Sequence, residues 1–185
     1  MTPKGRRKAV IYASILAVGL VAGFALRANV DRLLARQHLN LTYGDRATVM
    51  AQLFEAFCIG ALRGNPLDPT LSLTPANLQG SPIWVEHSTD LHVDLDLPQG
   101  CAVSDALRPL SPSEKVRLAN TVGDSIPSWT PELSPTEPDD AGFYSLKAWT
   151  TPVDDPQPRW GIVLYQLEET GPNAFTTIAL SLPRE

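Results

Sequence analysis

Four side chains that could ligate a cation or exchange protons lie close together in the sequence. They are Glu86, His92, Asp94 and Asp96. Residues 91–97 alternate apolar and polar types, which predicts a strand with the last three of these side chains on one face. Carboxylates beside an imidazole can bind a divalent cation or act as an acid and base. The alternative is an ordinary solvent-facing strand, because such strands show the same alternation.

A β-hairpin would bring Glu86 to the same face. Residues 83–87 are suitable for a partner strand, with a turn at residues 88–90. The apolar pairs that this register predicts are Val85 with Val93 and Ile83 with Leu95. The same register places Glu86 opposite His92. The four polar residues are therefore candidate metal ligands, with further ligands unnamed and no cofactor expected.

Other patterns add little catalytic chemistry. The sequence contains no G-x-S-x-G, Walker, dinucleotide-binding, H-E-x-x-H or C-x-x-C-H motif. The pairs Asp139–Asp140 and Asp154–Asp155 could bind a cation or a basic partner, or they could be solvated loops. Paired carboxylates can hydrolyse glycosides, but nothing in the sequence positions two of them across a substrate. An enzyme is therefore not favoured, and an unrecognised hydrolase remains the last alternative.

The chain has two cysteines, Cys58 and Cys101. Their spacing fits neither a zinc nor a haem motif, which would need close pairs. In a segment exported from the cytoplasm, two distant cysteines predict one disulfide bond. Two buried free thiols in a cytosolic domain are the alternative. A redox-active pair is the third and least favoured possibility, because no nearby residue would lower the pKa of a thiol.

The elements that must position these residues begin with an apolar segment. Residues 9–26 contain no charge and would make a helix about 27 Å long, close to the hydrocarbon thickness of a bilayer. A basic tail, residues 1–8, precedes it, which is typical of a signal-anchor or of a signal peptide cleaved after Ala25. The helical pattern continues through residues 27–40 as a basic amphipathic helix, which favours a retained transmembrane anchor.

Charge is divided unequally along the chain. Residues 1–40 carry seven basic and one acidic residue, whereas residues 41–185 carry eight basic and nineteen acidic ones. The basic end suits contact with the lipid bilayer, and the acidic remainder argues against a nucleic-acid partner. We expect a single-pass inner-membrane protein with a cytoplasmic N-terminus and residues 41–185 in the periplasm.

Residues 41–185 are expected to fold as one α+β domain, with an antiparallel sheet of about five strands and two main helices behind the transmembrane helix. One helix follows Asp45 as N-cap and carries an apolar stripe at helical spacing before Gly64 stops it. The other follows the capping box of Ser111 and Glu114, with Val116, Ala119, Val122 and Ile126 as its apolar stripe and Gly123 and Pro127 as its limits. The expected strands are residues 83–87, 91–97, 143–150, 160–167 and 175–182.

A long proline-rich and acidic segment, residues 127–142, is predicted as a surface loop, either a binding surface or a tolerated insertion. The sequence predicts a non-enzymatic accessory or assembly subunit that binds another membrane or envelope protein. Its candidate contact surfaces are this loop and the helix at residues 27–38. The alternative is a periplasmic module that binds a small ligand or cation on the polar face of the hairpin. The sequence resembles no family closely enough to choose between them.

Overall fold

The computed structural model describes residues 45–78, 80–95, 100–137, 144–154, 159–167 and 174–182. The transmembrane anchor expected at residues 9–26 and the amphipathic helix at 27–40 lie outside these residues. Within the described part of the chain, no helix is both long and apolar enough to cross a membrane. The architecture below is therefore that of the C-terminal domain.

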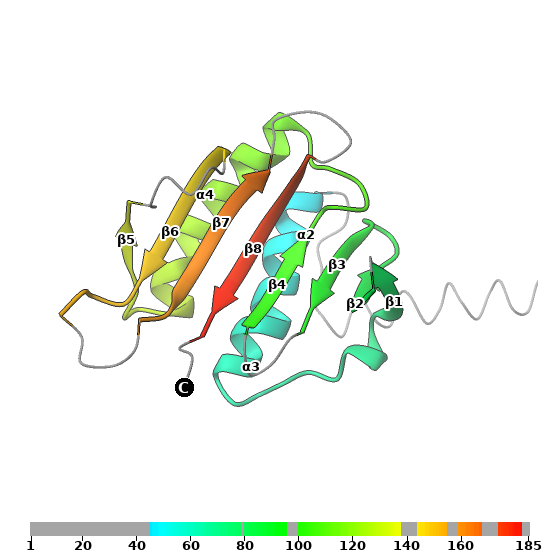
Figure 1. Ribbon diagram of the computed structural model, residues 1–185, viewed down its shortest axis with the longest axis horizontal. Coiled ribbons are helices and arrows are strands. Elements are labelled where there is room, and N and C mark those ends of the chain that lie inside the picture. Colours follow the sequence, from blue (N-terminus) through cyan, green and yellow to red (C-terminus); the bar gives the residue numbers. More distant parts are fainter. Residues whose placement is uncertain are drawn as a thin grey trace, which may run out of the picture. The chain divides into compact units, whose positions relative to one another are not determined.

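Two helical segments lie on one face of a single sheet (Figure 1). The first comprises α2 (Arg46–Leu53), the π-helical turn η1 (Phe54–Ile59) and α3 (Gly60–Leu62), which follow one another without a break. The Asp45 side chain accepts a hydrogen bond from the Ala47 N–H at 3.2 Å, which confirms the expected N-cap. The predicted apolar stripe is buried; its members are Val49, Met50, Leu53, Phe54 and Phe57.

The second helix, α4 (Pro112–Trp129), begins at the predicted capping box. Ser111 and Glu114 exchange side-chain and backbone hydrogen bonds, which satisfies donors that a helix start leaves unpaired. The expected end of the helix was wrong, because α4 continues past Pro127 to Trp129. Val116 is also 62% exposed rather than buried. The buried stripe is Lys115, Leu118, Val122, Ile126 and Trp129, which follows the helical repeat more closely.

The sheet has eight strands, all in antiparallel pairs, in the order β1-β2-β3-β4-β8-β7-β6-β5. Their bounds are β1 (Thr74–Leu78), β2 (Ser81–Glu86), β3 (Leu91–Asp94), β4 (Gly100–Ser104), β5 (Ser134–Thr136), β6 (Tyr144–Thr150), β7 (Gly161–Leu167) and β8 (Phe175–Ser181). A short 3₁₀ turn, η2 (Pro69–Leu71), precedes β1. Each helical segment is thus followed by a four-stranded meander, and the two meanders join where β4 pairs with β8.

The expected fold class was wrong. The sheet has eight strands instead of about five, and no described helix could span a membrane. The strands that were not expected are β1, β4 and β5. Two of them, β1 and β5, are edge strands that contain Pro75 and Pro135. Proline has no N–H group to donate to a neighbouring strand, but an edge strand tolerates it. A proline-rich edge strand therefore resembles a loop in its sequence, which explains why β1 and β5 were not expected.

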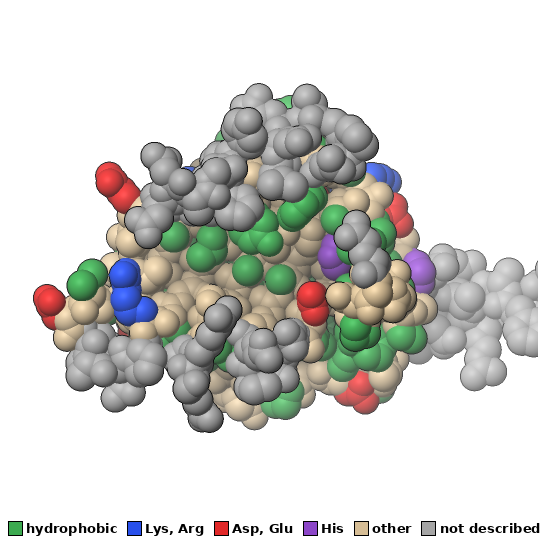
Figure 2. Space-filling view, viewed as in Figure 1, with side chains coloured by type: hydrophobic (Ala, Val, Ile, Leu, Met, Phe, Trp, Pro, Cys, Tyr) green, Lys and Arg blue, Asp and Glu red, His purple; other side chains and the backbone are tan. Residues whose placement is uncertain are grey.

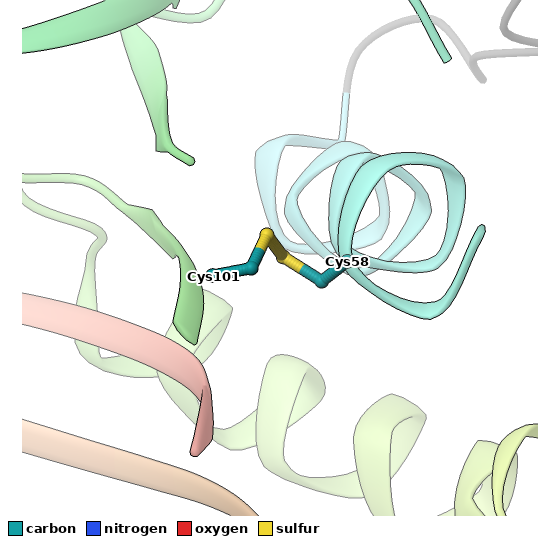
Figure 3. Close-up of a disulfide and its surroundings, with 2 residues drawn as sticks. All are labelled: Cys58 and Cys101. Atoms are coloured by element: carbon teal, nitrogen blue, oxygen red, sulfur yellow. A yellow bond between two sulfur atoms is a disulfide. The ribbon is translucent and has the colours of Figure 1, made fainter. Parts of the chain in front are cut away.

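The core lies between the sheet and the helices, and a disulfide joins the two layers (Figure 3). Cys58 in η1 and Cys101 in β4 are bonded, with Cα atoms 5.4 Å apart, which confirms the predicted bridge. In η1 the consecutive residues Phe57, Cys58 and Ile59 are all buried. The π-helical turn is wider than an α-helical turn. It therefore allows the cysteine and the two apolar side chains beside it to be buried together.

Buried polar side chains fasten the loops at one end of the sheet. The carboxylate of Asp105, which has no exposed surface, accepts hydrogen bonds from the N–H groups of Leu110 at 2.6 Å and Thr176 at 2.5 Å. Arg46 donates from Nε to the Thr89 carbonyl at 2.9 Å and also bonds the carbonyl of Arg108. These bonds hold the start of β3, the segment after β4 and the start of β8 close together.

Candidate functional site

His92 and Asp94 both lie on β3 and share one face of the sheet. Their neighbours Leu91 and Val93 point to the opposite face, where they belong to the core beneath the helices. We call the side away from the helices the outer face. Within the part of the chain that the structure describes, no helix covers it (Figure 1).

The register of the hairpin differs from the predicted one by one residue. The observed pairs are Trp84 with Val93, Val85 with His92, and Glu86 with Leu91. Because side chains alternate along a strand, this slip moves Val85 to the outer face and Glu86 to the helix side. The expected pairing of Glu86 with His92 was therefore wrong. Asp96 lies outside the described residues.

The turn explains this register. It spans four residues, 87–90, rather than three, and Asp90 adopts a positive φ of 57°. The Glu86 carboxylate accepts hydrogen bonds from the Ser88 hydroxyl at 2.7 Å and from the Thr89 N–H at 2.9 Å. Glu86 thus closes the turn with its own side chain, a role that the sequence pattern does not reveal.

His92 is almost completely buried although it lies on the outer face. Its side chain sits opposite Val85 on one neighbouring strand and Ser104 on the other, and the residue is 6% exposed. Its Nδ1 atom has no hydrogen-bond partner among the described residues. Burial lowers the pKa of His92, and the charge of Asp94 opposes this effect less strongly. The imidazole is therefore neutral near pH 7 and retains a nitrogen without a partner.

Small side chains cross the middle of the outer face next to His92 and Asp94. In register across four strands, this small-residue row is Ala102, Ala179, Val163 and Ala148. A parallel row consists of Gly100, Ser181, Gly161 and Thr150. A Cβ atom on Gly161 would lie 2.3 Å from the Trp149 carbonyl oxygen, so no larger residue fits there. Figure 2 shows hydrophobic side chains gathered over these central strands.

The two margins of this small-residue row differ in chemistry. On the β3 side lie His92 and the carboxylate of Asp94. On the β6 side Arg159 donates a hydrogen bond to the Thr150 hydroxyl at 3.0 Å, and this hydroxyl also contacts that of Thr136 at 2.7 Å. Asp94 is thus in register with one end of the small-residue row, and Arg159 contacts the β6 end of the parallel row.

The other acidic residues predicted as candidate sites do not form a cluster within the described residues. Asp139, Asp140 and Asp155 lie outside the described residues, and Asp154 is exposed. Of the expected loop at residues 127–142, the described portion contains the end of α4 and all of β5. Within the residues that the structure describes, no three His, Cys, Asp or Glu side chains are placed to hold a metal ion.

Sequence reasoning missed the outer-face residues contributed by β4 and β8. The signal was present but weak: Cys101 and Val103 alternate with Ala102 and Ser104 in a segment of only five residues. Alternation over so few residues could not identify β4 as a central strand. The strand that pairs with β4, β8, is more than seventy residues away in the sequence. No family model, curated protein or solved structure matches the chain.

Proposed function

We propose that this protein is a non-enzymatic accessory or assembly subunit of a membrane or envelope protein complex and that it makes its protein contact through the outer face of the sheet. The observation that carries the proposal is the small-residue row, which lies on a sheet face without a covering helix in the described residues. Sheets usually bury their apolar faces against another layer. In this row Ala102, Val163 and Ala179 are half-buried and Ala148 is buried, so a partner would contact the half-buried middle of the face.

The compartment in the proposal rests on two further features. A disulfide between Cys58 and Cys101 suits an oxidising environment such as the periplasm. The basic residues that precede the apolar segment 9–26 favour attachment to the inner membrane with the domain outside the cytoplasm. A reporter enzyme that is active only in the periplasm, fused after residue 185, should be active; activity of a cytoplasmic reporter at the same position would contradict this localisation.

The contact surface is tested by placing a charge in the small-residue row. Ala179→Glu introduces a carboxylate at its centre, and we expect it to remove a protein that copurifies with the tagged full chain in mild detergent. The control is Val116→Glu, which places the same charge on a residue of α4 that is already 62% exposed. Both variants should retain the disulfide on non-reducing gels. Equal copurification with both variants would contradict a docking role for the outer face.

The second candidate function is binding of a cation or small ligand at His92 and Asp94. The specific observation is a buried histidine with a lowered pKa, beside a carboxylate on the same face, whose Nδ1 has no hydrogen-bond partner in the part of the chain that the structure describes. Neutral imidazole is the form that ligates transition metals. Zinc added to the full chain should then raise its melting temperature, and His92→Ala should abolish this increase. An equal increase in His92→Ala would exclude His92 as a ligand.

A further inference from the structure

We draw no further inference here: the strongest candidate, the buried side-chain cluster of Arg46, Asp105 and Lys115 at the end of the sheet where β4 leads into α4, carries nothing more because the hydrogen bonds of Arg46 and Asp105 hold backbone groups of the same domain, and a proton-linked role would rest only on the pKa of Asp105, which burial raises.

Discussion

At the scale of single residues, His92 combines burial with a ring nitrogen that has no hydrogen-bond partner among the described residues. Desolvation lowers its pKa below the ordinary value of 6.5, and the nearby carboxylate of Asp94 offsets this only in part. A lowered pKa means that the folded protein favours neutral His92 more than the unfolded chain does. The stability contributed by neutral His92 is therefore complete above its ordinary pKa and is lost as the pH falls through the lowered value.

Replacing His92 by glutamine should accordingly change the pH dependence of stability. Between about pH 8 and about pH 5, the free energy of unfolding of the wild type should fall more steeply than that of His92→Gln, because only the wild type must protonate a buried imidazole. Urea denaturation at a series of pH values measures both curves. The exposed His87, changed to Gln, controls for loss of a histidine as such. Parallel curves for the wild type and His92→Gln would show that His92 is not desolvated in this way.

At the scale of elements, the two helices pack side by side with their N-termini at the same end of the sheet. Asp45, the N-cap of α2, forms an ion pair with Arg117 in α4 at 3.4 Å. At the other end Arg63, just after α3, donates to the carbonyls of Ser128 at 2.8 Å and Trp129 at 3.1 Å. Helices in the same direction bring like ends of their dipoles together, so a cation at the C-terminal end is favourable.

Arg63→Ala tests this role. Loss of the cation and of both hydrogen bonds should lower the free energy of unfolding by about 1 kcal/mol, since the side chain is exposed and its charge is well solvated. Arg63→Lys keeps a cationic donor at this position and should recover part of the loss. Chemical denaturation of the three proteins gives the comparison. A loss in Arg63→Lys as large as that in Arg63→Ala would show that guanidinium geometry, rather than charge, holds the helix ends.

At the scale of the whole molecule, the disulfide is the covalent link between the helical layer and the sheet. Cys58 and Cys101 are both buried within the same hydrophobic cluster and are separated by 43 residues in sequence. Their bond restricts the unfolded chain and fixes η1 against β4. Both cysteines are buried, which favours a stabilising role for this bond.

Removing both cysteines together should cost roughly 4 kcal/mol of stability in the chain-entropy model of disulfides. The variant Cys58→Ala/Cys101→Ala leaves no unpaired thiol, so it isolates the loss of the bond and of two small side chains. Guanidinium denaturation with and without reductant provides the measurement. Reductant should destabilise the wild type and have no effect on the variant. Equal stability of the oxidised wild type and the variant would contradict a stabilising role.

Local signals in the sequence identified much of the helical layer. Asp45 and Ser111 each precede a helix as its N-cap. A short polar side chain at this position accepts a hydrogen bond from a free N–H group of the first turn, and this local effect does not depend on tertiary contacts. The apolar stripe from Val49 to Phe57 and the pairing of Cys58 with Cys101 were likewise predicted. The strands β6, β7 and β8 also lie where apolar sequence between turns predicted them.

The outer face could not be predicted in the same way. Its register at β2–β3 depends on a four-residue turn closed by Glu86, and a difference of one residue reverses every side chain of the strand. The placement of β4 beside β8 depends on packing against both helices rather than on any nearby residue. Edge strands with proline carry almost no local signal.

The sequence by itself thus determined the features that arise from neighbouring residues: both helix starts, the apolar stripe of the first helix, the division of charge and the cysteine pair. Only the tertiary structure decided which strands are neighbours, which face each strand presents, and that His92 and Asp94 border a row of small side chains while Glu86 does not. The physical reason is that caps and periodicity depend on contacts within one turn of chain, whereas strand pairing and burial depend on contacts between segments that are far apart in sequence.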